Sequence, residues 1–263
     1  MPSASAYGLV FHGSRDPRSQ QAAQTLTTYV RQRLQVRTHV PQALGAIAGL
    51  ASSLDPPPAS LVSVQDTYLE CHPQSLTDQL RDWLRALPAP SAPLTCRLIP
   101  VFLSAGVHVM EDIPTAIAAL PTDYPAIHLR LTSYLGCQPG LTRVLNERMA
   151  AHPVEAWVLL AHGSRRSGAN EQLEARAAQV GAVAAFWATP PSLEMRIQEL
   201  AAVGLRRIGI LPYFLFTGGV TDAIAQTVTQ LTQSYPDLSL TLVPPLDANL
   251  AALADIVVNL ADT

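Results

Sequence analysis

The sequence of 263 residues contains no lysine, and all 17 of its permanently cationic side chains are arginines. Mechanisms that depend on a lysine are therefore excluded, among them Schiff-base chemistry, lysine-anchored pyridoxal phosphate and a Walker-A nucleotide site. Charged residues make up only 14% of the chain, the net charge is −3, and no basic block occurs. Nucleic acid is for this reason not an expected partner.

Cysteine is also scarce, since Cys71, Cys96 and Cys137 are the only three and form no CxxC pair. This argues against a disulfide framework, a structural zinc and a cysteine-bound cluster, and we expect a cytoplasmic protein. Long apolar runs of about 18 residues are absent, so no membrane span is expected. The N-terminal sequence lacks the basic and apolar regions of a secretory signal.

The chain does contain an internal duplication. LVFHGSR at 9–15 recurs as LLAHGSR at 159–165, and IPVFLSAG at 99–106 recurs as LPYFLFTG at 211–218. Two motifs in the same order indicate two similar lobes, for which we predict the ranges 1–152 and 153–263. The first lobe is longer between its motifs, and we assign the excess to 41–60. We interpret the end of this segment as a loop insertion and part of the segment as an extra helical turn.

Strand-like and helix-like segments alternate in both halves. The predicted strands are 7–11, 61–69, 96–103, 127–134, 156–160, 181–187, 207–215 and 238–243. The predicted helices are 20–34, 74–87, 113–120, 170–180, 193–203 and 221–233. Such alternation is typical of an α/β fold with a parallel sheet flanked by helices, here one small sheet in each of two lobes related by pseudo-twofold symmetry. Ligands of such sheets bind beyond the carboxyl ends of the strands.

Three polar residues follow successive predicted strands of the first lobe: His12, Glu70 and His108. Two imidazoles and a carboxylate that converge at one sheet edge suit a divalent transition metal with open positions, and histidine also suits proton transfer near neutral pH. The alternative is structural: each could be a hydrogen-bonded residue at a strand end. Glu111 and Asp112 could likewise be simple charges at a helix start.

The second lobe keeps a histidine, His162, but lacks the other two groups. The duplication aligns Ala188 with Glu70 and Val220 with His108, so we predict a single metal site, in the first lobe. His162 is then either a relic or part of a substrate-binding surface. Side chains near the two HGSR motifs could bind an anionic substrate at the helix starts, namely Ser14, Arg15, Arg18, Arg165 and Arg166.

The HGSR motif, the strand ending in YLE and the segment VFLSAGVHVMEDIP together resemble the sirohydrochlorin chelatases of the class II chelatase group, in their long duplicated form. The resemblance covers nearly the whole chain. It implies two chelatase-like lobes and the insertion of Co²⁺ or Fe²⁺ into sirohydrochlorin, feeding cobalamin or siroheme synthesis. It carries the family's metal-site residues onto His12, Glu70 and His108, and it makes the substrate's eight carboxylates partners for Arg15, Arg18 and Arg165.

Departures from the family pattern concern the segment after Glu70 and the end of the chain. Pro73 lies three positions beyond Glu70 rather than four, and His72 intervenes; of an extra ligand and an incidental residue we favour the latter. The chain carries neither a histidine-rich stretch nor a C-terminal cysteine motif, so we expect no iron–sulfur cluster and no permanently bound cofactor. The internal pseudo-dimer makes a monomer the expected state.

Two other functions compete with the chelatase hypothesis. A non-catalytic carrier of metal or tetrapyrrole with the same fold would retain its ligand without turnover. A phosphoryl-transfer enzyme could use His12 with Arg15 at the helix start, but this alternative leaves Glu70 and His108 without a role.

Overall fold

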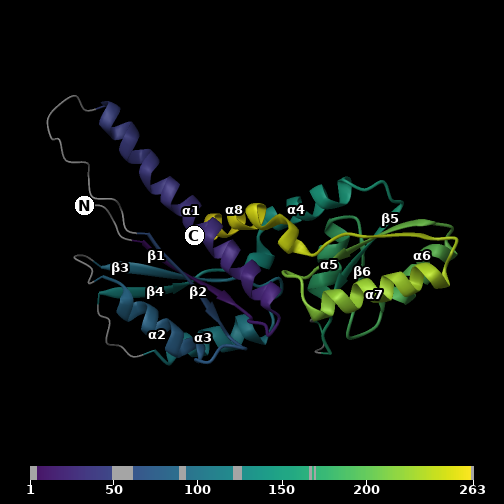
Figure 1. Ribbon diagram of the computed structural model, residues 1–263, viewed down its shortest axis with the longest axis horizontal. Coiled ribbons are helices and arrows are strands. Elements are labelled where there is room, and N and C mark those ends of the chain that lie inside the picture. Colours follow the sequence, from purple (N-terminus) through teal and green to yellow (C-terminus); the bar gives the residue numbers. More distant parts are fainter. Residues whose placement is uncertain are drawn as a thin grey trace. The chain divides into compact units, whose positions relative to one another are not determined.

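The computed structural model describes residues 5–48, 62–88, 93–120, 126–165, 168 and 170–261, with the side chains of 38–48 excepted. The chain divides into two compact units, one made of 1–15, 23–135 and 251–263, the other of 16–22 and 136–250. Each unit contains a four-stranded sheet whose strands are all parallel (Figure 1). The predicted α/β class with two similar lobes is thereby confirmed.

The first sheet has the strand order β2-β1-β3-β4. Its strands are β1 (Ser5–Phe11), β2 (Val62–Tyr68), β3 (Leu94–Pro100) and β4 (Ile127–Leu131). The central strand β1 is buried from Ala6 to Phe11, as expected for a parallel strand that is covered on both faces. Because all four strands run in the same direction, the segments after β1, β2 and β3 emerge at one edge of the sheet.

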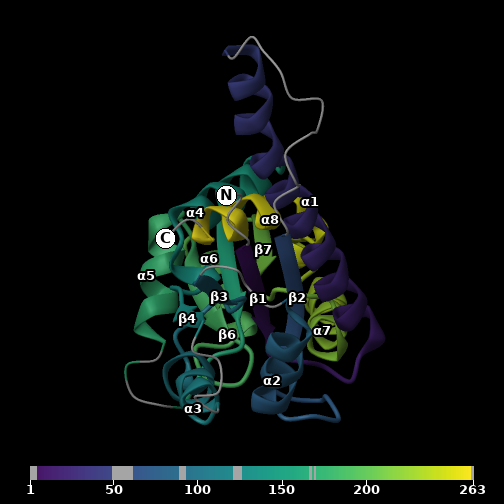
Figure 2. The same ribbon diagram turned by 90° about the vertical axis from the view of Figure 1, so that its left-hand side faces the viewer.

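Helices cover both faces of the first sheet: α2 (Leu76–Ala86) and α3 (Ile113–Ala118) on one side, and α1 (Pro17–Ala48) and α8 (Leu250–Leu260) on the other (Figures 1 and 2). The α2 and α3 side is closed by a buried cluster that includes Leu80, Trp83 and Ile113. On the opposite side Arg33 of α1 binds the carboxylate of Asp255 at 2.5 Å, which joins α1 to α8.

The second unit repeats the arrangement, with the strand order β6-β5-β7-β8. Its strands are β5 (Ala156–Ala161), β6 (Val183–Phe186), β7 (Arg207–Pro212) and β8 (Ser239–Leu242). Its helices are α4 (Pro139–Ala150), α5 (Glu171–Gln179), α6 (Leu193–Ala202) and α7 (Gly219–Ser234). Buried side chains of α6 and α7, among them Ile197 and Ile224, pack on the sheet as α2 and α3 do in the first unit.

The structure contains two helices that the sequence analysis did not predict. They are α4, which follows β4 and a 3₁₀ turn at Leu135–Cys137, and α8, which follows β8 and a 3₁₀ turn at Leu246–Asn249. The compact units place α8 with the first sheet and α4 with the second. The boundary near 152 and 153 concerns the sequence repeat and stays a prediction.

The first helix is longer than predicted. The apolar spacing suggested a helix over 20–34, whereas α1 continues through Pro41 and Gly45 to Ala48. Part of the predicted insertion is therefore helical, and its remainder, 49–60, lies outside the described residues. Among the helices that are described, none combines the length and the apolar character needed to cross a lipid bilayer.

The three thiols differ in exposure, and this gives a direct check on the fold. Cys96 on β3 is fully buried, and burial raises the pKa of its thiol to about 11, whereas Cys71 and Cys137 are exposed. Because the thiolate is the reacting species, we expect N-ethylmaleimide to modify two thiols of the native protein at neutral pH and the third only in denaturant. Mass spectrometry counts the adducts, and rapid modification of Cys96 in the native protein would contradict the packing of β3.

Candidate metal centre

His12 follows β1 directly, and its ring is exposed beyond the sheet edge. The Nδ1 atom lies 3.1 Å from the backbone oxygen of Gly13. A carbonyl oxygen can only accept, so in this contact Nδ1 carries the hydrogen and Nε2 keeps a free lone pair. The His12 ring can therefore bind a metal through Nε2.

Glu70 is held beside His12 by two backbone hydrogen bonds beyond the ends of their strands. Leu69 N–H donates to the oxygen of Phe11 at 3.0 Å, and Glu70 N–H donates to the oxygen of His12 at 2.8 Å. Gly13 makes this close approach possible: its φ is +95°, and a Cβ atom at that position would lie 1.9 Å from the backbone oxygen of Glu70. Glycine is thus required at position 13 for two reasons: its positive φ, and the close approach of the Glu70 backbone, which leaves no room for a side chain.

His108 lies in a π-helical turn, His108–Asp112, that precedes α3. The wider turn is closed by a hydrogen bond from Ile113 N–H to the oxygen of His108. One Oδ of Asp112 lies 2.7 Å from Nδ1 of His108. With an ionised carboxylate as acceptor, Nδ1 again carries the hydrogen and Nε2 is the atom available to a metal.

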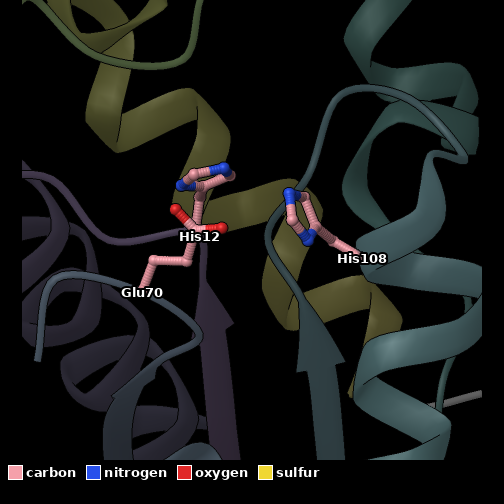
Figure 3. Close-up of side chains that lie close together, drawn as sticks. All are labelled: His12, Glu70 and His108. Atoms are coloured by element: carbon pink, nitrogen blue, oxygen red, sulfur yellow. The ribbon is translucent and has the colours of Figure 1, made fainter.

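The three side chains converge, as Figure 3 shows. Ligand atoms of His12, Glu70 and His108 all lie within 4.8 Å of one another. The two imidazole rings meet edge to face, with centroids 4.7 Å apart. Phe102 lies near both, with centroid distances of 6.4 Å to His12 and 6.2 Å to His108. Two nitrogens and one oxygen suit a divalent transition metal, and their exposure leaves coordination positions open to another ligand.

The predicted substrate-binding arginines differ in the contacts that they make within their own units. Arg18 is held by two carboxylates, Asp16 at 2.7 Å and Asp222 at 2.6 Å. These hydrogen bonds, the one to Asp16 first, raise the pKa of the Arg18 guanidinium, and Arg18 in turn lowers the pKa of both carboxyl groups. The guanidinium of Arg18 is therefore already paired with two carboxylates of the second unit.

The other predicted binding residues lie in or directly after the two HGSR motifs. Arg15 and Arg165 are exposed, Ser14 is half-buried, and Arg166 lies outside the described residues. The part of Arg15 and Arg165 in substrate binding stays a prediction.

His72 is placed by a loop contact rather than by the cluster. Its ring stacks on that of Tyr68 at 6.0 Å with an interplanar angle of 11°. The backbone N–H of Gln74 lies 3.2 Å from its Nδ1. Within the described part of the chain the group of candidate metal ligands comprises His12, Glu70 and His108, and the incidental nature of His72 stays a prediction.

The second unit repeats the backbone of the site without its ligands. Ala188 N–H donates to the oxygen of His162 at 2.8 Å, as Glu70 does to that of His12. Gly163 has a φ of +81° and, like Gly13, has no room for a Cβ. The structural counterpart of Glu70 is therefore Ala188, which carries no ligand atom, as the sequence alignment of the two halves predicted.

Sequence reasoning missed the contact between Asp112 and His108. Both residues were noted, but Asp112 was considered only as a charge at a helix start. The available signal was the spacing of four positions between a histidine and a carboxylate, which places two side chains on the same side of a helical turn.

Comparison of the sequence with models of protein families identifies the family of this chain. The family model described as CbiX matches residues 60–152 and again residues 156–262. The chain belongs to the CbiX family. The first match begins beyond the HGSR motif at 12–15, whereas the second match includes the HGSR motif at 162–165. Two successive matches to one family model agree with the internal duplication seen in the sequence.

Known proteins similar to this CbiX-family chain include one curated sequence and two solved structures. Sirohydrochlorin cobaltochelatase of Priestia megaterium is 23% identical over 161 residues, 55% of this chain and 53% of that protein. The chain thus spans about half the length of this relative. SirB from Bacillus subtilis with Fe³⁺ has a TM-score of 0.71 at 19% identity, covering 98% of this chain and 94% of SirB.

The second structure is the sirohydrochlorin chelatase SirB from Bacillus subtilis subspecies spizizenii in complex with cobalt. It has a TM-score of 0.67 at 18% identity and covers 98% of this CbiX-family chain and 94% of its own. At such identities the likeness shows the fold. It extends over nearly the whole of both chains.

Proposed function

We propose that this chain inserts a divalent metal, Co²⁺ or Fe²⁺, into sirohydrochlorin. The observation that carries the proposal is the cluster of His12, Glu70 and His108, whose ligand atoms lie within 4.8 Å of one another at an exposed sheet edge. Membership of the CbiX family and likeness to a named sirohydrochlorin cobaltochelatase and to SirB structures with Fe³⁺ and cobalt support it.

The reaction exchanges one metal ion for two protons. Four bonds form between the metal and the ring nitrogens of the tetrapyrrole, the bonds from the metal to the protein break, and two pyrrole N–H protons leave. A suitable protein site binds the metal through a few ligands and leaves positions open for the incoming nitrogens. Once released from the metal, Nε2 of His12, Nε2 of His108 and the Glu70 carboxylate each offer a lone pair to a departing proton.

We assign binding of the substrate's carboxylates to the exposed arginines that end the two HGSR motifs. Arg15 and Arg165 are exposed, and a guanidinium binds a carboxylate through two parallel hydrogen bonds. Since the net charge of the chain is −3, attraction of an anionic substrate has to come from such local groups. The ion pairs of Arg18 with Asp16 and Asp222 make it a weaker candidate than the sequence suggested.

The remaining parts of the proposal concern the setting of the reaction. Two imidazoles and a carboxylate can bind both Co²⁺ and Fe²⁺, so the supply of each metal in the cell decides which one is inserted. The metal in turn decides whether the product feeds cobalamin or siroheme synthesis. We place the protein in the cytoplasm as a monomer, on the grounds of its three free cysteines and its two lobes in one chain.

The proposal is tested by anaerobic absorbance spectroscopy of sirohydrochlorin mixed with the purified protein, with Co²⁺ and Fe²⁺ in separate cuvettes and the uncatalysed rate subtracted. We expect a spectral change faster than the control with at least one metal, and the ratio of the kcat/KM values gives the preference. A protein that binds sirohydrochlorin or metal without accelerating insertion would instead be a carrier, and the chelatase proposal would be wrong.

A further inference from the structure

We propose that Asp112 is a positioning residue that orients His108 and makes it the stronger of the two histidine ligands. The inference deepens the proposed function and rests on it for its biological meaning. Its physical basis is the 2.7 Å contact between Oδ2 of Asp112 and Nδ1 of His108, within the π-helical turn that precedes α3.

The contact fixes both the tautomer and the direction of the ring. With its hydrogen on Nδ1 and directed at the carboxylate, His108 presents the lone pair of Nε2 to the opposite side, where His12 and Glu70 lie (Figure 3). A carboxylate behind a metal-binding imidazole also increases the ability of the other nitrogen to donate to the metal. Asp112 thus prepares His108 for metal before the metal arrives.

The two histidines of the site are supported unequally. Behind His12 is the neutral carbonyl oxygen of Gly13, at 3.1 Å, whereas behind His108 is the carboxylate of Asp112. Since charge-assisted hydrogen bonds are the stronger kind, His108 is the ligand that retains the metal and His12 the one that releases it more easily. A site that must first hold and then surrender a metal benefits from this difference.

The competing explanation for Asp112 is that it stabilises the start of α3. Asp112 is the residue before Ile113, the first of the helix, and aspartate is a favoured capping residue there. Its side chain nevertheless makes no capping hydrogen bond, and its backbone is helical, with φ −68° and ψ −46°. The carboxylate of Asp112 therefore contacts His108 and does not cap α3.

The local register supports a specific role for this turn. Gly106 and Ile113 are seven positions apart, whereas Gly218 and Ile224, their counterparts at the start of α7, are six apart. Ile113 and Ile224 are both fully buried in corresponding core clusters. The first unit therefore has one extra residue, accommodated by the π-helical turn, as is common at functional sites.

The test compares Asp112→Asn with Asp112→Glu and with Glu111→Gln, a control that removes a negative charge from the same turn. Co²⁺ alone is titrated anaerobically into each purified protein, and thermal unfolding verifies the fold. We expect Asp112→Asn to weaken Co²⁺ binding about 10- to 100-fold, because this is the usual effect of losing such a supporting carboxylate. Asp112→Glu should recover most of the affinity, and Glu111→Gln should retain it.

A second comparison addresses the asymmetry between the ligands. His108→Ala should weaken Co²⁺ binding more than His12→Ala does. Equal losses would overturn the proposed difference, and an unchanged affinity in folded Asp112→Asn would overturn the role of Asp112. Because sirohydrochlorin is absent from these titrations, failure of the wild-type protein to insert metal would refute the proposed function alone, and the affinities would still decide the role of Asp112.

Discussion

His12→Ala and His108→Ala are each expected to lower the rate of metal insertion by about 100- to 10,000-fold, the range found when a group that accepts a proton in the reaction is removed. Each substitution also removes one of only three ligands in the described cluster. His12 follows β1 directly and His108 lies in the π-helical turn before α3. Neither side chain belongs to the buried core, so the expected change in the free energy of unfolding is within about 0.5 kcal/mol. The rates are measured by anaerobic absorbance and the stabilities by thermal unfolding.

The matched control for these variants is His162→Ala. His162 follows β5 as His12 follows β1 and takes part in an equivalent backbone hydrogen bond, but its neighbour Ala188 offers no ligand atom. We therefore expect His162→Ala to cost far less activity than either first-lobe variant. Losses of equal size at His12 and His162 would show that both lobes take part in the chemistry and would refute the single-site hypothesis.

Gly13→Ala is expected to destabilise the protein and to disrupt metal binding together. The residue has a φ of +95°, and an added Cβ would lie 1.9 Å from the backbone oxygen of Glu70. The unfavourable φ costs about 1–3 kcal/mol, and the overlap with backbone adds about 1–3 kcal/mol. Relief of the overlap has to move Glu70 away from His12, so the affinity for Co²⁺ should fall along with the unfolding midpoint.

Gly163→Ala separates the two effects of the Gly13 substitution. Gly163 has a φ of +81°, and a Cβ there would lie 2.7 Å from atoms of Phe186 and Thr189, so a comparable loss of stability is expected. Its neighbours carry no metal ligand, and the affinity for Co²⁺ should stay unchanged. If Gly13→Ala and Gly163→Ala affect metal binding equally, the effect of Gly13 is a general loss of stability rather than a displacement of Glu70.

Much of the fold is predictable because it depends on local patterns. The buried run at 7–11 and the helical spacing at 74–87 each have a period that reports the element directly. The two missed helices also carried signals: in α4 apolar residues recur at 141, 144, 145 and 149, after a proline at the first position, and in α8 buried residues at 253, 254, 256, 257, 258 and 260 surround exposed Asp255 and Asn259. Two polar residues four positions apart mark the exposed side of a helix, a signal that the sequence analysis did not use for α8.

The candidate metal ligands could be predicted from the sequence, but the contacts that position them could not. The positions of His12, Glu70 and His108 after successive predicted strands identified them as a set, and the duplication then limited the predicted metal site to the first lobe. The contact between Asp112 and His108 lies in a π-helical turn, which the sequence patterns did not identify. Similarly, the need for glycine at Gly13 becomes evident only when Glu70 is brought within reach.

The extra residue in the turn between Val109 and Ile113 bears on how the two halves diverged. Point substitutions that replaced Ala188 by glutamate and Val220 by histidine would restore the three ligand types to the second half, next to His162. The second half would still be one position short between Gly218 and Ile224, and no carboxylate would take the place of Asp112 behind the new imidazole. Restoring a supported site in the second half would therefore need an in-frame insertion in addition to the two substitutions. An in-frame insertion is a rarer genetic event than a base change. The difference between the two halves is for this reason expected to persist in evolution.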